Sequence, residues 1–315
     1  MADAILVIKL AALGDFVQAL GPMAAIRRHH SNAQITLLTT TVFSNLAEAS
    51  GLFDAVWTDS PPKTLDLAGW WRLRQRLRAT GFERVYDLQT SDRSSFYYRL
   101  FLPGPRPVWS GIASGCSHPH TNPRRDFMHT IERQAEQLAI AGIGDVPKTD
   151  LRKIDADIDG FELPQPFVLI VAGGARHRPD KRWPSSNFAE LARHFSTIGL
   201  CPVLIGRADE AVLINDIARA APKAFNLAGL TKLVQLPTLA RKAAFAVGND
   251  TGPMHVFAAA DCASLVLYSE ASNPALCGQR GRSVSILQRK SLSDLSVAEV
   301  LDRVPLPSTF HAVSA

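Results

Sequence analysis

Cysteine is scarce in this chain of 315 residues, and the four that occur are scattered without a C-x-x-C pair: Cys116, Cys201, Cys262 and Cys277. Zinc sites and disulfide frameworks are recognised by closely spaced cysteines, so neither is indicated. Unpaired cysteines are typical of a reducing compartment, which makes the cytoplasm the expected location.

Long apolar runs are lacking as well. No segment approaches the ~18 uninterrupted apolar residues that a membrane-spanning helix needs. The apolar start is broken by Asp3, Lys9 and Asp15, without a basic leader or a cleavage site. We therefore expect a protein that is neither exported nor membrane-spanning. Internal repeats and low-complexity tracts are also missing, which excludes a repeat architecture.

The chain has no strong excess of one charge. Lys and Arg number 34 against 29 acidic residues, for a net charge of +5. This mild excess fits phosphorylated ligands or an anionic membrane surface better than sequence-specific DNA binding, although an ordinary basic surface would look the same. With 46% hydrophobic residues, the chain suits two domains of about 150 residues each.

Strand-like and helix-like segments alternate along the first half. Residues 4–10 are an apolar run expected of the central, buried strand, and apolar residues at helical spacing follow through residues 16–26. This alternation predicts a doubly wound α/β domain. Gly14 and Asp15 lie at the carboxyl edge of the first strand, where ligands bind in such sheets. A carboxylate there is a base, a ligand clamp or a helix N-cap. No G-x-G-x-x-G follows the strand, so a dinucleotide site is not indicated.

Residues 65–80 form a basic, amphipathic helical segment. Trp70, Trp71, Leu73 and Leu77 are interleaved with arginines at 72, 74, 76 and 78. Such a face can touch anionic lipid headgroups. The simpler interpretation is a solvated helix with its aromatic residues in the core.

The second half begins with an apolar strand at residues 167–172, followed by a glycine-rich, cationic segment at residues 173–184. Backbone N–H groups and cations together suit a polyphosphate, whereas the simpler interpretation is a basic surface loop. His118 and His120, in an irregular stretch of the first half, lack further ligands at a recognisable spacing, so no metal site is expected.

One stretch of the second half has the pattern of a strand, a tight turn and the start of a helix. A strand at residues 243–247 ends in Asp250, Thr251 and Gly252, and an apolar helical segment follows. Asp250 or Thr251 can cap the helix, and Pro253 suits its first position. The N–H groups at a helix start favour phosphate, although an ordinary strand-to-helix turn would have the same spacing.

Residues 250–255 resemble the nucleotide-sugar motif of glycosyltransferase family nine, the bacterial ADP-heptose:lipopolysaccharide heptosyltransferases. Residues 9–17 resemble its N-terminal signature, in which the aspartate after glycine, here Asp15, is the general base. Residues 173–184 resemble its Gly-Ala and Lys-x-Trp-Pro pattern, in which the lysine, here Lys181, contacts donor phosphate. The acidic residue that holds the donor ribose corresponds to Glu210 more closely than to Asp209. At residues 269–274 the chain departs from the family's Phe-Gly-Pro-Thr-Asp-Pro.

The resemblance implies a GT-B architecture: two Rossmann-like domains whose parallel sheets face a central cleft. Residues 1–155 would bind the acceptor and residues 156–315 the nucleotide sugar, and the last helix can pack back toward the N-terminal domain. The composition changes over residues 142–166, which fits an interdomain crossing.

The implied activity is inverting, metal-independent transfer of a sugar, heptose from ADP-heptose, to a lipopolysaccharide-core or other cell-surface glycan. No cofactor and no nucleic acid is expected, and the enzyme would be cytoplasmic with peripheral contact to the inner membrane. A nucleotide-sugar epimerase of the same fold and a degenerate binding protein stay as alternatives. Besides the catalytic Asp15 and Lys181, the expected donor contacts are Gly174, Lys181, Glu210, Asp250, Thr251, Gly252, Pro253, Met254 and His255, and the weaker acceptor contacts are Gly14, Gln89, Arg93 and Arg124.

Overall fold

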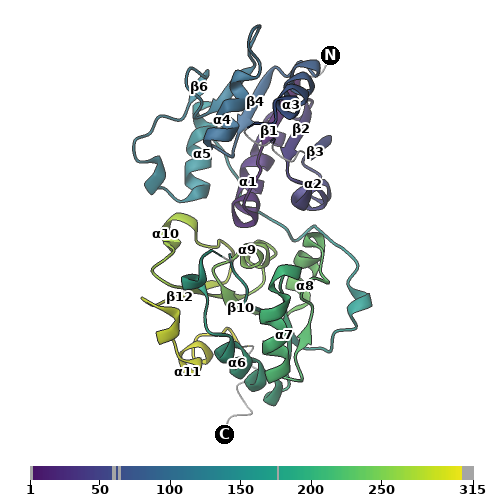
Figure 1. The fold of residues 1–315 in the computed structure, drawn as a ribbon, viewed down its shortest axis with the longest axis vertical. Coiled ribbons are helices and arrows are strands. Elements are labelled where there is room, and N and C mark those ends of the chain that lie inside the picture. The colour runs from purple at the N-terminus through teal and green to yellow at the C-terminus, as the bar shows by residue number, and fades with distance from the viewer. Residues whose placement is uncertain (1–2, 59–61, 63–64, 176, 307–315) are drawn as a thin grey trace. The chain divides into compact units, whose positions relative to one another are not determined.

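The computed structural model describes residues 3–58, 62, 65–175 and 177–306. The chain divides into two compact units, Met1–Thr149 and Asp150–Ala315 (Figure 1). Residues 150–155, which the sequence assigned to the first domain, therefore lie in the second unit. Each unit is built around one parallel sheet of six strands.

The sheet of the first unit has the order β3-β2-β1-β4-β5-β6. Ile8 of β1 pairs with Leu38 of β2 on one side and Asp87 of β4 on the other, so the central position expected for the first strand is confirmed. The strands are β1 (Ala4–Ile8), β2 (Gln34–Thr39), β3 (Ala55–Thr58), β4 (Arg84–Asp87), β5 (Val108–Gly111) and β6 (His118–Pro119).

Helices lie against this sheet (Figure 1), and local sequence sets several of their starts. Asp66 accepts from Gly69 N at 2.8 Å and Ser91 Oγ accepts from Ser94 N at 3.2 Å, and both satisfy N–H groups of a first turn. Leu73 and Leu77 turn inward to join the core around Trp109. The helices are α1 (Leu13–His29), α2 (Ser44–Ala49), α3 (Leu67–Ala79), α4 (Asp92–Arg99) and α5 (Thr130–Ile140).

The second sheet has the order β12-β11-β10-β7-β8-β9. A Cβ on Gly248 of β10 would lie 2.6 Å from the carbonyl oxygen of Val171 in β7, so glycine allows the two strands to approach. The strands are β7 (Phe167–Val171), β8 (Cys201–Leu204), β9 (Phe225–Asn226), β10 (Ala246–Asn249), β11 (Ser264–Tyr268) and β12 (Val284–Gln288).

A second apolar core, including Phe188, Phe195 and Phe245, fills this unit. Residues 296–299 form a capping box, because Ser296 Oγ accepts from Glu299 N at 3.3 Å and Glu299 Oε2 accepts from Ser296 N at 3.0 Å. The helices are α6 (Ser185–Thr197), α7 (Ala211–Ala220), α8 (Leu236–Lys242), α9 (Gly252–Ala259), α10 (Pro274–Cys277) and α11 (Val297–Leu301). Among the described residues of the whole chain, no helix is long and apolar enough to cross a membrane.

Candidate active site

The predicted donor residues of the second unit gather at one sheet edge. Strands β11, β10, β7 and β8 are consecutive neighbours and all parallel, so the segments that follow them meet at the same carboxyl edge. These segments carry Gly174 and Lys181 after β7, Glu210 after β8 and Asp250 after β10. In open α/β sheets this is the edge at which ligands bind.

A compact polar cluster ties three of these segments together. Lys181 Nζ lies 3.0 Å from Asp250 Oδ2 and 2.9 Å from Ser272 Oγ, and the Ser272 hydroxyl donates to the same Asp250 oxygen at 2.7 Å. Gln279 Nε2 donates to Asp250 Oδ1 at 3.1 Å, and Tyr268 OH donates to Gln279 Oε1 at 2.8 Å. Both oxygens of the Asp250 carboxylate are therefore engaged.

Asp250 is held in its charged form. Its side chain is 8% exposed, against 18% for Lys181. Burial by itself would raise the pKa of the Asp250 carboxyl, but the Ser272 hydrogen bond and the Lys181 ammonium together lower it below its ordinary value. An ammonium has three N–H donors. Two are directed at Asp250 and Ser272, so Lys181 retains one for a ligand oxygen.

Glu210 holds two loops together through hydrogen bonds. Its Oε1 accepts from Gly174 N at 2.8 Å and its Oε2 accepts from Arg207 N at 2.9 Å. Its side chain is only 11% exposed, whereas Asp209 is 44% exposed and pairs with Arg207 at 2.7 Å. The structure thus embeds Glu210 in the site and leaves Asp209 at the surface, consistent with the preference for Glu210 in the sequence.

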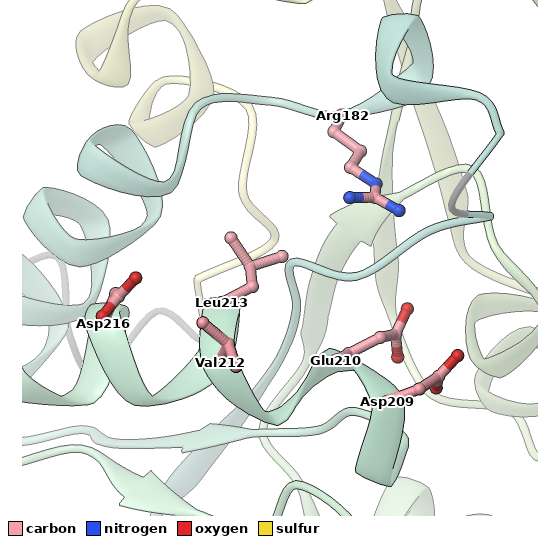
Figure 2. Close-up of a pocket in the computed structure, with 6 residues that line it drawn as sticks. All are labelled: Arg182, Asp209, Glu210, Val212, Leu213 and Asp216. Atoms are coloured by element: carbon pink, nitrogen blue, oxygen red, sulfur yellow. The ribbon is translucent and has the colours of Figure 1, made fainter.

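A pocket of about 310 Å³ opens beside Glu210. Figure 2 shows the Arg182 guanidinium directed toward the Glu210 carboxylate, with the other lining residues projecting from the 3₁₀ turn Ala208–Glu210 and from α7. Arg182 donates through Nη2 to Gly174 O at 2.6 Å, while its Nε is buried and has no partner among the described residues. The lining residues are Arg182, Asp209, Glu210, Val212, Leu213 and Asp216.

The start of α9 differs in detail from its sequence prediction. The helix begins at Gly252, so Pro253 is its second residue rather than its first. Neither predicted cap forms: Asp250 turns to Lys181, and Thr251, at the N-cap position, makes no capping bond. The Thr251 hydroxyl is buried without a partner among the described residues. Met254 and His255 are 0% and 7% exposed, so their side chains pack inside the unit.

In the first unit, Asp15 is the third residue of α1 and Ala12 occupies the N-cap position. The interpretation of Asp15 as an N-cap is therefore wrong. Among the described residues, its Oδ2 accepts one hydrogen bond, a long one of 3.4 Å from Ala12 N. The half-buried carboxylate keeps most of its hydrogen-bonding capacity, which leaves the base and ligand-clamp hypotheses open.

Gln89 supports the loop that carries Asp15. Its Oε1 accepts from Leu10 N at 2.9 Å and from Ala11 N at 3.1 Å, so it fixes the backbone between β1 and α1. Gly14 lies in the first turn of α1. Arg93 is exposed and donates to Pro62 O at 3.4 Å, and Arg124 is exposed on another loop. The acceptor roles of these residues stay predictions.

Two buried charges lie behind this loop. Lys9 is 3% exposed and donates to Leu88 O at 3.3 Å, and Asp87 is fully buried with its Oδ1 accepting from Gln89 N and Thr90 N at 3.1 and 3.0 Å. Burial raises the pKa of Asp87 to about 6. Burial also lowers the pKa of Lys9, although Asp15 and Asp87 attract its charge and oppose the shift.

Sequence reasoning missed Ser272, Gln279 and Tyr268. Ser272 stands where the family pattern has threonine, so the hydroxyl is kept despite the departure at residues 269–274. Asn273 stands where the pattern has aspartate, and its Oδ1 accepts from Ala275 N at 3.0 Å to cap α10. Tyr268 could have been found from its place at the end of the strand beside β10. No pattern in the sequence indicated a role for Gln279.

Among the described residues, no group of three or more His, Cys, Asp or Glu side chains could hold a metal ion. The cationic segment after β7 instead offers Arg178, Lys181 and Arg182, of which Arg178 donates to the carbonyl of Ala271. Arg176, which the sequence also placed in this cationic segment, lies outside the described residues.

Known proteins resemble this chain in sequence and in fold. Residues 70–296 match the family described as glycosyltransferase family 9 (heptosyltransferase). Lipopolysaccharide heptosyltransferase 1 of Pseudomonas aeruginosa is 26% identical over 306 residues, which cover 89% of this chain and 82% of that protein. Lipooligosaccharide heptosyltransferase 2 of Haemophilus influenzae is 35% identical over 110 residues, which are 33% of this chain and only 32% of that protein.

A solved structure of Escherichia coli ADP-heptose LPS heptosyltransferase II superposes on 96% of this chain and 97% of its own, with a TM-score of 0.79 and 22% identity. This likeness shows a shared fold. The GT-B architecture of two Rossmann-like domains that the sequence predicted is thereby confirmed.

Proposed function

The chain belongs to glycosyltransferase family 9, the heptosyltransferases, and on that basis we propose that it transfers heptose from ADP-heptose to a lipopolysaccharide-core or other cell-surface glycan. The observation that carries the proposal is the Lys181, Asp250 and Ser272 cluster, which lies at the same sheet edge as Glu210. It joins a cation and a helix start at the sheet edge where a nucleotide diphosphate would lie. The name of the structurally similar Escherichia coli enzyme supports ADP-heptose as the donor.

The donor side of the reaction follows from these contacts. Each Glu210 oxygen accepts one backbone N–H and has a further lone pair for a ribose hydroxyl. The remaining N–H of Lys181, the Thr251 hydroxyl and the start of α9 would face the diphosphate. As the bond from the anomeric carbon to the phosphate oxygen breaks, negative charge grows on the diphosphate, and these donors would stabilise it.

The acceptor side would use Asp15. Its carboxylate takes the proton of the acceptor hydroxyl while that oxygen forms the new bond to the anomeric carbon, and the configuration inverts. Gln89 acts indirectly, because it fixes the loop on which Asp15 is carried.

A chelation experiment tests whether cationic side chains, rather than a metal ion, stabilise the departing diphosphate. The cationic segment after β7 supports this, since Mg²⁺ sites usually combine one or two carboxylates with substrate phosphates. We expect turnover to be unchanged after dialysis against EDTA. Turnover that disappears and returns with Mg²⁺ or Mn²⁺ would contradict the metal-independent mechanism.

Two alternatives make different predictions in one assay. An epimerase would convert the nucleotide sugar without a separate acceptor, and a degenerate binding protein would bind the nucleotide without turnover. We propose to incubate the protein with ADP-heptose, with and without a delipidated lipopolysaccharide-core acceptor, and to measure ADP. Release of ADP that depends on the acceptor is the expected result. Release without acceptor, or none with it, would reject the proposed transfer.

We place the enzyme in the cytoplasm, in peripheral contact with the inner membrane. A lipopolysaccharide-core acceptor carries lipid chains and is held at a membrane surface. A protein that works on it gains from weak, reversible binding to that surface, because attachment raises the local concentration of enzyme near its acceptor.

A further inference from the structure

Helix α3 presents an apolar and cationic stripe to the outside of the first unit. Leu67 is 80% exposed and Trp71 is 60% exposed, and Arg74 and Arg78 follow them at the i+7 and i+11 positions. At 3.6 residues per turn these four residues lie along one side of the helix. Leu73 and Leu77 lie on a different side of the helix and are buried. The interpretation that the aromatic residues of this segment lie in the core is therefore wrong for Trp71.

Helix α4 and the turn after it extend the stripe. Phe96 of α4 is 41% exposed and its ring lies 5.1 Å from that of Trp70 in α3. Leu102 is 44% exposed, and its carbonyl accepts from Arg74 Nη2 at 2.5 Å. These contacts join the two helices into one surface, here called the α3–α4 surface, with Leu67, Trp71, Phe96 and Leu102 as its apolar members. Leu65, 91% exposed, precedes it.

The α3–α4 surface carries more positive than negative charge. Residues 65–80 contain four arginines and a single acid, Asp66, whose carboxylate is used to cap α3. Exposed Arg99 on α4 and Arg106 beyond it add two cations, against one further acid, Asp92, in the first turn of α4. The Arg76 guanidinium is engaged elsewhere, because its central carbon lies 4.1 Å from the centroid of the Trp57 ring.

Large apolar side chains gathered beside arginines are unfavourably exposed when this surface faces water alone. Isolated exposed apolar residues need no explanation, but large ones gathered on one surface mark an interaction site. A protein partner would have to supply both an apolar patch and many carboxylates. A bilayer of anionic lipids supplies phosphates at the depth of the guanidinium groups and acyl chains below them, where tryptophan is favoured. We infer that the α3–α4 surface docks on an anionic lipid bilayer.

This inference names the surface that makes the membrane contact in the proposed function, but its test is independent of sugar transfer. The full chain would be sedimented with vesicles of phosphatidylcholine alone, or with about a third phosphatidylglycerol, without glycan or nucleotide. We expect binding to the anionic vesicles only, reversed by high salt because exposed charges are screened. Failure to bind anionic vesicles at low salt would overturn the inference.

Variants locate the contact. Leu67→Ser with Trp71→Ser should lower the partition coefficient at least tenfold, and Arg78→Gln should reduce the preference for anionic lipid. Val212→Ser with Leu230→Ser, on the other unit, removes side chains that are 77% and 63% exposed and should bind vesicles like the parent. Equal loss in this control pair would overturn the assignment to the α3–α4 surface.

Two further measurements separate the remaining outcomes. Turnover of the Leu67→Ser/Trp71→Ser variant with a delipidated, water-soluble acceptor should equal that of the parent, so loss of membrane binding and failure of the proposed transfer can be told apart. Sedimentation of the free protein would detect a dimer. A dimer that the same variant abolishes, with vesicle binding unchanged, would assign the surface to a second copy of the chain and overturn the inference.

Discussion

Lys181 is a single side chain on which binding and stability both depend. We expect Lys181→Met, which keeps the aliphatic stem, to lower turnover about 10- to 100-fold, since one charge-assisted hydrogen bond to the departing diphosphate contributes about 1.5–3 kcal/mol. The free energy of unfolding should also fall, because Asp250 would be left 8% exposed without its ammonium partner. Steady-state kinetics and denaturant titration measure the two effects.

Asp180→Asn is the matched control for Lys181→Met. Asp180 is next in the chain, is 57% exposed and lies 3.7 Å from Arg178. Exposed pairs contribute little, so both quantities should stay near the parent values. If Lys181→Met turns over substrate as fast as the parent protein, we would assign the contact with the diphosphate to Arg178 or Arg182 instead.

Asp15→Asn tests the proposed base at the same scale. The amide has nearly the size of the carboxylate but cannot accept the acceptor proton, so turnover should fall by roughly 10²–10⁴-fold. Among the described residues, its carboxylate accepts only the 3.4 Å hydrogen bond from Ala12 N, so the melting temperature and ADP affinity should change little. Near-normal turnover by the folded variant would make Asp87 or Asp92 the next carboxylate to test.

At the scale of elements, the donor site depends on how closely the segments after β7 and β8 approach. A Cβ on Gly173 would overlap the Glu210 carboxylate, whereas a Cβ on Gly174 would meet nothing nearer than the Arg182 side chain at 3.4 Å. We expect Gly173→Ala to displace Glu210 and to weaken ADP binding by about tenfold, roughly one lost hydrogen bond. Gly174→Ala should lose less. Calorimetric titration with ADP measures both, and equal losses would contradict the steric argument.

Sequence periodicity predicted the order of the elements because a parallel strand buried on both faces is a short apolar run, visible in residues 4–10 and 167–172. It also placed Lys181 and Asp250 after strands, whereas Glu210 was identified from the family resemblance. It could not show that Ser272 and Gln279 complete the Asp250 cluster, because those bonds span 22 and 29 residues and depend on how the segment after β11 folds back. The exposure of Trp71 could not be predicted from the sequence either, since an amphipathic pattern does not say which aromatic residue faces inward.

For the whole molecule, each of the two units buries apolar side chains of its own. Each unit has its own parallel sheet and its own hydrophobic cluster. Chains with two such units often unfold in more than one step, so changes in stability are best assigned to the unit that carries the substituted residue. The pH dependence of unfolding offers such an assignment, because the first unit contains Asp87, a fully buried carboxyl whose pKa is raised.

Burial raises the pKa of Asp87 to about 6, while Lys9 and Arg125 are the cations that face it. The folded chain thus keeps a proton that the unfolded chain releases near pH 4. The free energy of unfolding should therefore fall as pH rises from about 4 to about 6, by up to ~3 kcal/mol, with no further change from this group above that range.

Comparison with Asp87→Asn isolates this effect. Asp54 and Asp250 have lowered pKa values, so their stabilisation is present above about pH 4 and is lost only below it, which is the opposite dependence. The variant keeps these groups but lacks the Asp87 titration. We expect the parent to lose stability relative to Asp87→Asn between pH 4.5 and pH 6.5, measured by urea unfolding of both proteins across that range. If their difference is constant with pH, Asp87 is ionised throughout, and the Lys9 ammonium must compensate its burial in full.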